Sequence, residues 1–386
     1  MAYKEAFISG IGTSEIGVRL TRSPLGLTLD ATREALAESG LSFDQIDGVS
    51  TYPGRVPSYL GFSPIGADEV IEAFGLKTRW HIGGGEMTAQ LGAIEAAVLA
   101  VRSGLARHVL CFRTVYEAAA MARPDEFPPL RRKEVDGLSQ WTAPFFAISA
   151  ANWVAQFATL QMKRYGMTRD HLASIVLNAH ANALRNPRAI VKKAVTYDEY
   201  MSARMISSPF CLYDCDRYAD ASTAIIVSAE DALDEVKCTP VRVAATAGSV
   251  DRYSWDQTEF AASYATGRDL WTRTDYTKDD VDLVQFYDGF SFFPITWLEG
   301  LGFCEVGEGH KFVEGGKRIA LDGELPLNSG GGQLGVGRLH GFGFAHEAVT
   351  QLRGLGGERQ IPGDPKVAIA ASGGGPLASA LLLAKD

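Results

Sequence analysis

The chain has 386 residues, of which 46% are hydrophobic and 22% charged, a composition typical of a globular protein with a large buried core. Its 37 Lys and Arg against 46 Asp and Glu give a formal net charge of −9, so no overall basic field exists to attract nucleic acid. The lack of an apolar run of about 20 residues, of a signal-peptide pattern and of a second close cysteine pair predicts a cytoplasmic protein without a membrane span, disulfide or structural metal.

Short β-like runs alternate with helical stretches along the first half, which predicts an α/β fold. A strand is expected over 6–10 and a helix over about 27–39, with Gly40 as its left-handed C-cap. Glycines 83–85 then open an Ala-rich helix over about 86–103. This helix is apolar nearly all round and should be buried. It is followed by a strand over 108–112.

Residues 114–166 break this alternation and predict a loop domain inserted in the first half. The insertion contains prolines, a basic run and several aromatics, at Pro124, Pro128, Pro129, 131–133, Trp141, Phe145, Phe146 and Trp153. A long insertion of this kind commonly forms a lid or a binding wall. An exposed aromatic surface can instead bind a partner or a second subunit, and the sequence leaves both interpretations open.

The second half repeats the pattern of the first. Strands are expected over 240–247 and 284–286, and a Gly-rich segment then leads into a helix ending near Arg353. The strand over 367–371 runs into three further glycines. Two halves that each contain a Gly-rich turn, a buried helix and a strand indicate an internal duplication, with residues 1–235 as the first half and 236–386 as the second.

Several segments resemble the thiolase superfamily, and the resemblance extends over nearly the whole chain. Asp44-Gln45-Ile46-Asp47-Gly48 and the stretch from Asp214-Cys215 to Ala224 are similar to family segments. Tyr287-Asp288-Gly289-Phe290-Ser291 stands where thiolases have N-E-A-F-A, Leu339-His340-Gly341 where they have G-H-P, and Ala371-Ser372-Gly373-Gly374-Gly375 where they have C-x-G-G-G. The resemblance implies a duplicated, five-layered αβαβα fold, a homodimer and an acyl-CoA thioester as substrate.

Both cysteines that thiolases use in catalysis are missing. The first position falls on Met87, with Thr88 beside it, and the second is Ala371. A thioether cannot hold an acyl group as a thioester, and a threonine hydroxyl would need a base within hydrogen-bond distance, so Claisen acyl transfer by the usual route is disfavoured. Met87 is most simply a core residue. The residues expected to border the substrate are Met87, Thr88, Asn328, Gly332 and Gly374.

The residues that remain can handle an enolate. His340 follows a glycine run and precedes a helix, which favours a neutral imidazole that donates to a thioester oxygen, although it could simply cap the helix. Tyr287 places a phenol where thiolases have Asn, and it is either a general base or acid or a core aromatic. Asp288 could polarise it, but adjacent side chains on a strand point to opposite faces. His180, at a helix end, is interpreted as structural.

This pattern resembles the thiolase-like steroid side-chain aldolases and their lipid-transfer-protein-like relatives. The resemblance implies retro-aldol cleavage of a β-hydroxyacyl-CoA, with Tyr287 as base and His340 on the enolate oxygen, coenzyme A entering with the substrate and no separate cofactor. It also implies a small OB-fold, zinc-ribbon partner that binds the acyl-CoA. Two alternatives stay open: a non-catalytic acyl-CoA or lipid carrier, and a non-standard acyltransferase that uses Thr88 or another hydroxyl.

Overall fold

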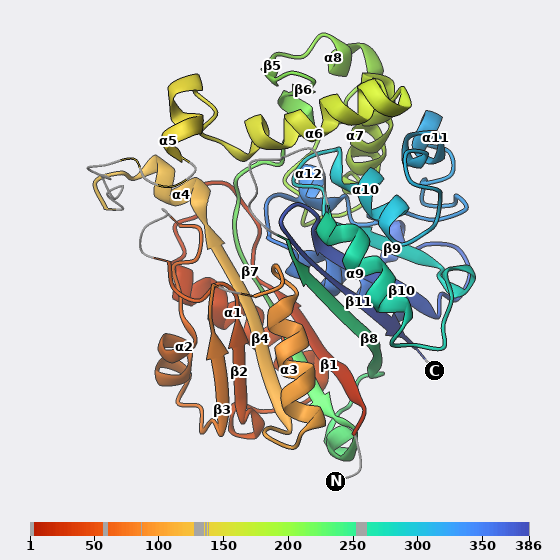
Figure 1. Ribbon diagram of the computed structural model, residues 1–386. Coiled ribbons are helices and arrows are strands. Elements are labelled where there is room, and N and C mark those ends of the chain that lie inside the picture. Colours follow the sequence, from red (N-terminus) through yellow and green to blue (C-terminus); the bar gives the residue numbers. More distant parts are fainter. Residues whose placement is uncertain are drawn as a thin grey trace.

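A large mixed sheet built from both halves of the chain organises the molecule (Figure 1). The computed structural model describes residues 4–56, 61–85, 87–126, 135, 137, 139–251 and 261–385. Within them, strands pair in the order β3-β2-β4-β7-β1-β8-β11-β10-β9. Their bounds are β1 Ala6–Thr13, β2 Gly48–Thr51, β3 Trp80–Gly83, β4 His108–Tyr116, β7 Asp220–Ala229, β8 Val241–Val250, β9 Leu283–Phe286, β10 Val367–Gly373 and β11 Leu377–Ala384. A separate ribbon pairs β5 (Met205–Ser207) with β6 (Phe210–Cys211).

The two halves of this sheet mirror each other. From β1 outward, β7 and then β4 follow antiparallel, and β2 follows parallel to β4. From β8 outward, β11, β10 and β9 follow with the same three senses. The halves meet where β1 pairs antiparallel with β8, at Phe7–Arg242 and Ile8–Val241. This correspondence confirms the predicted internal duplication.

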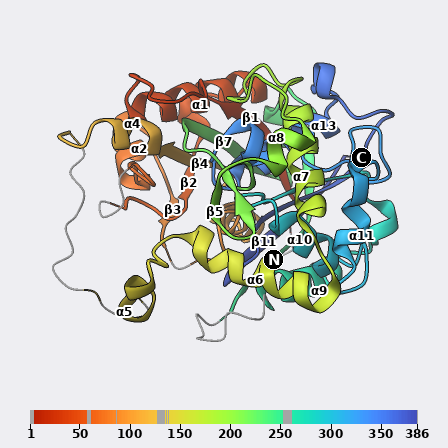
Figure 2. The ribbon, with the colours of Figure 1, turned by 90° about the horizontal axis from the view of Figure 1, so that it is seen from above.

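Helices cover the outer faces of the two half-sheets and fill the space between them (Figure 2). On one outer face, α1 (Pro24–Ser39) and α2 (Ala67–Phe74) pack against β2, β4 and β7. On the other, α9 (Ala261–Trp271) and α10 (Phe293–Gly300) cover β8 to β11. Between them, α3 (Gly92–Arg102) and α13 (Phe342–Leu352) share one buried cluster with residues of both half-sheets. The five layers confirm the predicted αβαβα fold.

The helix predicted over 86–103 is shorter than expected, because α3 begins only at Gly92. Ala89 has a φ of +61°, a left-handed conformation that a right-handed helix cannot contain. The turn before α3 packs on β8, since a Cβ added to Gly248 would lie 2.4 Å from the Cβ of Thr88. The helix is largely buried as predicted, and the exception is Leu99, which is 57% exposed.

The region predicted as an inserted loop domain begins differently from the sequence expectation. Strand β4 pairs with β7 as far as Tyr116 and Asp220, so residues 114–116 are buried strand. The rest contains α4 (Glu117–Ala122), α5 (Ser139–Thr142) and α6 (Ala150–Tyr165). The predicted prolines 128 and 129 and the basic run 131–133 lie outside the described residues. The remaining helices are α7 (Arg169–Ala183), α8 (Tyr197–Met201), α11 (Gly309–Val313) and α12 (Gly332–Val336).

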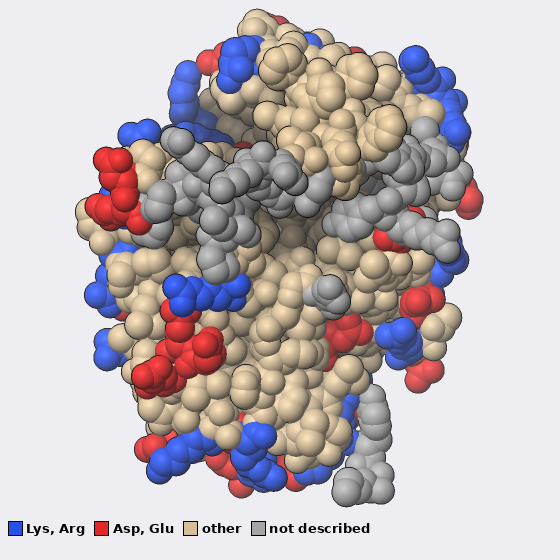
Figure 3. All heavy atoms as spheres, turned by 60° about the vertical axis from the view of Figure 1, so that its left-hand side comes forward, with Lys and Arg blue, Asp and Glu red and all other residues tan. Residues whose placement is uncertain are grey.

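The surface carries both signs of charge. On the face drawn in Figure 3, basic and acidic side chains are interspersed. In the part of the chain that the structure describes, no helix combines the length and the apolar character needed to cross a bilayer. All five cysteines are free thiols.

Candidate active site

Segments that the sequence analysis singled out meet near the N-terminal ends of α3 and α13. They are 87–91, 287–289, 338–341 and 371–374. The backbone N–H of Tyr287 donates to the Ala371 carbonyl at 3.0 Å. The Ser372 hydroxyl donates to the Gln90 side chain. A Cβ on Gly341 would lie 2.6 Å from Ser372 Oγ and 2.9 Å from Gln90 Cβ, so these segments are in direct contact.

His340 is the histidine at this junction, and it is 4% exposed. Its Nδ1 accepts a hydrogen bond from Arg113 Nη2 at 2.8 Å. Its Nε2 lies 3.5 Å from Glu117 Oε2, longer than a normal hydrogen bond. The Phe62 ring packs on the imidazole with centroids 4.6 Å apart. Burial, with a contribution from Arg113, lowers the pKa of His340 to about 4, so the imidazole is neutral at pH 7.

An ion network continues from Glu117 away from the imidazole. Arg338 Nη1 lies 3.6 Å from Glu117 Oε1, and Arg338 Nη2 donates to Asp216 Oδ1 at 2.6 Å. Glu117 and Asp216 are 1% and 9% exposed. Although burial opposes ionisation, His340, Arg338 and Arg113 hold the pKa of Glu117 below its usual value. The network therefore keeps a carboxylate beside a neutral histidine in a nearly dry environment.

Tyr287 lies directly after β9 and is half-buried. Its ring contacts Phe293 and Phe344, with centroid distances of 5.4 and 6.3 Å. A Cβ on Gly289 would lie 2.6 Å from the Tyr287 hydroxyl, so this glycine leaves room for the phenol. Burial and then the charge of Asp216 raise the pKa of Tyr287 above its usual value, whereas Arg338 and Gln333 lower it. The phenol is therefore neutral at pH 7.

Asp288 does not pair with Tyr287 but caps the short helix α12. Its Oδ1 accepts from the backbone N–H of Gln333 at 2.6 Å, and Gln333 Oε1 in turn accepts from the backbone N–H of His340 at 2.7 Å. Burial raises the pKa of Asp288 to about 7. Asp288 thus positions the segment that carries His340, and this geometry does not support the direct polarisation of Tyr287 considered from the sequence.

Three residues expected at the substrate have structural partners instead. Both ends of the Asn328 amide bond the backbone of Phe286, at 2.8 and 2.9 Å. A Cβ on Gly332 would lie 1.9 Å from Asp288 Oδ2, so Gly332 is required by the capping carboxylate. Gly374 has a φ of +126° and packs beside Phe293. The partners of all three are chain neighbours of Tyr287 or, for Phe293, a ring that contacts it.

Met87 and Thr88 occupy the turn before α3. Met87 is half-buried and packs against the middle-layer core, as expected for a thioether. Thr88 Oγ1 donates to Glu95 Oε2 at 3.1 Å, so a carboxylate does stand at hydrogen-bond distance from this hydroxyl. Glu95 also accepts from Thr246 Oγ1 at 3.3 Å and lies 3.8 Å from Arg273 Nη1.

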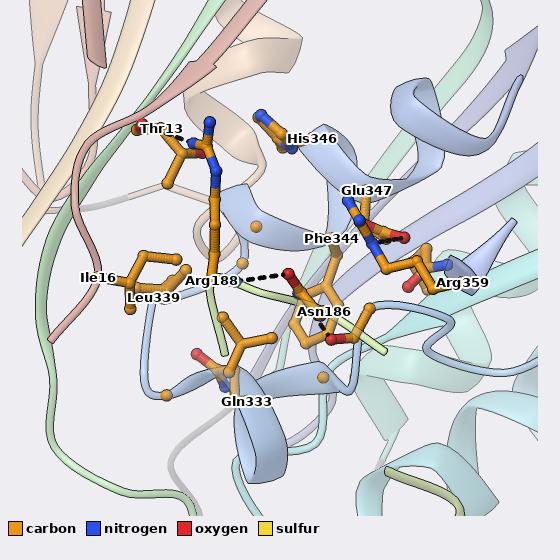
Figure 4. A pocket seen from close by; sticks show the side chains of 17 residues that line it. Thr13, Ile16, Asn186, Arg188, Gln333, Leu339, Phe344, His346, Glu347 and Arg359 are labelled. Carbon is orange, nitrogen blue, oxygen red and sulfur yellow. Dashed lines mark hydrogen bonds and ion pairs between the residues drawn. The ribbon is translucent and has the colours of Figure 1, made fainter. Parts of the chain in front are cut away.

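A small cavity is lined by residues of α12 and of the first turns of α13 (Figure 4). Its volume is about 60 Å³, room for a few water molecules and too little for an acyl-CoA. The charged groups in its wall are already paired, since Arg359 Nε donates to Glu347 Oε1 at 3.0 Å and Arg188 bonds Glu34 and the Thr13 carbonyl. Within the described ranges, no group of three or more His, Cys, Asp or Glu side chains could hold a metal ion.

His180 lies near the end of α7, 7% exposed, with its ring 5.8 Å from that of Tyr213. Four residues of the His340 network were not predicted: Arg113, Glu117, Asp216 and Arg338. A detectable signal was present for two of them, because Arg113 and Glu117 interrupt an otherwise apolar run that starts at the β4 strand. Charges placed in a buried strand usually have a partner or a function.

Comparisons with known proteins identify the family. Residues 244–384 match the family model described as Thiolase C-terminal domain-like. An acetyl-CoA acetyltransferase of Methanothermobacter thermautotrophicus is 33% identical over 282 residues, which cover 70% of this chain and 73% of that protein. The chain belongs to the thiolase superfamily. The resemblance found in the motifs is thereby confirmed.

Two relatives match this thiolase-superfamily protein over nearly its whole length. The steroid side-chain-cleaving aldolase of Thermomonospora curvata is 29% identical, covering 99% of this chain and 98% of that protein. The 17-hydroxy-3-oxo-4-pregnene-20-carboxyl-CoA lyase of Mycobacterium tuberculosis is also 29% identical, covering 98% and 99%. A solved structure described as an Ltp2-ChsH2(DUF35) aldolase superimposes with a TM-score of 0.87 at 27% identity, covering 99% of this chain and 98% of that one.

Proposed function

We propose that this protein cleaves a β-hydroxyacyl-CoA by a retro-aldol reaction, releasing a ketone and a short acyl-CoA, and that the bulky part of the substrate is a steroid or a similar group. The observation that carries the proposal is a buried, neutral imidazole whose Nδ1 is held by Arg113, in a chain that has a tyrosine where thiolases have an asparagine and that lacks both catalytic cysteines. The Arg338 charge acts on both this imidazole and the Tyr287 phenol. The names of the two full-length relatives, an aldolase and an acyl-CoA lyase, support the same reaction.

The reaction needs three events. The β-hydroxyl loses its proton, the bond between the α and β carbons breaks to leave a ketone, and the electron pair of that bond forms the enolate of the thioester. A proton delivered to the α carbon then gives the short acyl-CoA. No acyl group is held by the protein, so the absence of a nucleophilic cysteine is no obstacle.

His340 is suited to the enolate. Because Arg113 donates to Nδ1, the imidazole proton is on Nε2, which makes only a long contact of 3.5 Å with Glu117 Oε2. In the proposed complex this neutral N–H would donate to the thioester oxygen and stabilise the charge that develops there. In a nearly dry site such a donor stabilises the enolate charge more strongly than it would in water.

Tyr287 is the proposed base for the β-hydroxyl. Its phenolate would be supported by Arg338 and Gln333 but opposed by burial and by Asp216. Since these effects together raise the pKa, the deprotonated fraction should grow about tenfold per pH unit through the neutral and alkaline range. A base role therefore predicts that kcat/KM rises with pH without reaching a plateau below pH 10, whereas an acid role predicts no change over that range, because the phenol stays protonated.

Acyl transfer through Thr88 is the second candidate, and the contact with Glu95 is the observation that favours it. The same carboxylate, however, also accepts from Thr246 and lies beside Arg273, so it does not serve Thr88 alone. The retro-aldol reaction needs no acyl group on Thr88 and matches the names of the two full-length relatives, and it is therefore preferred.

The proposal includes the partners implied by the family resemblance. A small OB-fold, zinc-ribbon protein would deliver the acyl-CoA, and two copies of this chain would form a homodimer in the cytoplasm. Trp141, Phe145 and Phe146, which are 63%, 82% and 82% exposed, offer an apolar contact for substrate or partner. The solved aldolase whose description includes a DUF35 component supports a partner of this kind. Coenzyme A would enter as part of the substrate, without a separate cofactor.

Product analysis tests the function directly. The purified chain, with and without the zinc-ribbon protein, is incubated with 17-hydroxy-3-oxo-4-pregnene-20-carboxyl-CoA in D₂O. The expected products are a 17-ketosteroid and propionyl-CoA that carries one deuteron on its α carbon, both identified by mass spectrometry. A trapped acyl-enzyme on Thr88 would favour the acyltransferase, and tight binding without turnover would favour a carrier.

A further inference from the structure

Arg113 is an unusual residue for the middle of a buried strand. It lies in β4 and is 1% exposed. Its Nη2 donates to the Phe62 carbonyl at 2.6 Å as well as to His340 Nδ1, and Nη1 donates to the Thr114 carbonyl at 3.2 Å. Burial of a guanidinium carries a large desolvation cost, so a strand with this residue needs a reason to retain it.

A guanidinium has donors and no acceptor. The contact of 2.8 Å between Arg113 Nη2 and His340 Nδ1 therefore requires a lone pair on Nδ1. In a neutral imidazole the proton must then be on Nε2, the nitrogen that points toward Glu117. A rotation or tautomer change that put the proton on Nδ1 would place two N–H groups against each other.

The charges around the imidazole partly oppose one another. The charged groups that face it are Arg113 from β4, Glu117 from α4 and Arg338 from the segment before it. The two arginines oppose an imidazolium, whereas the Glu117 carboxylate, 3.5 Å from Nε2, favours it; burial adds to the effect of the arginines and keeps the ring neutral.

We propose that Arg113 is a positioning residue, which holds His340 in the neutral Nε2–H tautomer, the form whose N–H can leave its long contact with Glu117 Oε2 and donate to a substrate oxygen. The catalytic part of this inference rests on the proposed function of His340. The tautomer itself does not, and it can be measured without substrate.

Nitrogen NMR of the ¹⁵N-histidine-labelled protein tests the assignment. The chain has seven histidines, and the His340 signals are identified by their loss in His340→Gln. We expect an unprotonated Nδ1 and a protonated Nε2, unchanged from pH 8 to pH 5. A wild-type ring protonated on Nδ1, or on both nitrogens at pH 7, would overturn the proposal even if every Arg113 variant failed to fold.

Variants of Arg113 sharpen the test. Arg113→Met should let the imidazole titrate nearer its usual pKa of about 6.5 and should lower kcat by up to about 100-fold. Arg113→Lys keeps a donor and a charge, so it should retain part of the lowered pKa of His340 and part of kcat. Arg242→Met is the matched control, since Arg242 lies on β8 and bonds Tyr276 at 3.1 Å. An unchanged tautomer and titration in Arg113→Met would contradict the role of Arg113. The expected NMR pattern without ketone formation would instead remove the proposed function and leave the tautomer assignment intact.

Discussion

The turn before α3 and the segment before α13 occupy corresponding places in the two halves of the fold, and they differ in chemistry. The first turn presents a thioether and a threonine, with one carboxylate behind them. The second presents His340, held by a guanidinium on one nitrogen and facing a carboxylate with the other. The first turn lacks the thiol that a covalent acyl group requires, whereas the second holds a neutral imidazole among buried charges, the group that the proposed function assigns to the enolate.

The largest effect is expected from Tyr287→Phe. If the phenol takes the β-hydroxyl proton, kcat should fall by about 10²–10⁴, the range for loss of a general base or acid. Steady-state formation of the ketone measures this. Tyr197→Phe, at a side chain 45% exposed on α8, is the matched control and should retain full activity. Cleavage at the normal rate by Tyr287→Phe would remove the base assignment.

Removal of the imidazole should be the next largest effect. His340→Gln is expected to lower kcat by about 10²–10³ with a smaller change in KM, because an oxyanion donor acts mainly on the transition state. The control is His81→Gln on the exposed face of β3. A variant that raised KM alone would mean that His340 only binds substrate.

The same residue should make stability depend on pH. Because the pKa of His340 is lowered to about 4 in the folded chain, the unfolded chain binds more protons between about pH 6.5 and 4. The contribution of His340 to the free energy of unfolding is fully present above pH 6.5. It falls by on the order of 3 kcal/mol as the pH is lowered toward 4. Urea unfolding at pH 7.5 and 4.5 should show a smaller loss for His340→Gln than for the wild type. Equal losses would contradict the low pKa.

Gly332→Ala tests the scaffold of the second segment. The added Cβ would overlap Asp288 Oδ2, and the φ of +58° strains any side chain, at a cost of about 1–3 kcal/mol from the backbone alone. A lower melting temperature is expected. Gly84→Ala is the matched control, since its Cβ would meet nothing within 4 Å. Similar melting temperatures for the two variants would show that the Asp288 cap is dispensable.

The smallest effect is expected from Thr88→Ala. If the first turn no longer holds an acyl group, kcat should change by less than about threefold. This corresponds to a change of less than about 1 kcal/mol in the activation free energy. Loss of most of the activity, together with loss of a trapped acyl-enzyme, would reverse the comparison between the two segments and favour the acyltransferase.

Local patterns were sufficient for most of the fold. The strands over 6–10 and 367–371, the helix before Gly40 and the helix before Gly354 follow from period, caps and glycines, and the structure confirms them. The start of α3 was wrong because the left-handed Ala89 is imposed by packing on β8 and leaves no trace in composition.

For the site, the sequence by itself determined which segments carry chemistry, that both cysteine positions lack a thiol, and that a histidine and a tyrosine stand at the remaining family positions. Only the tertiary structure decided the protonation states and the hydrogen-bond partners of these residues. Arg113 is 227 positions from His340, and a contact at that separation is created by strand order and layer packing rather than by any local pattern. Asp288 was likewise reassigned from Tyr287 to the cap of α12 by a turn 45 residues further along the chain. Proton location depends on such contacts because burial makes each hydrogen-bond partner and each nearby charge decisive.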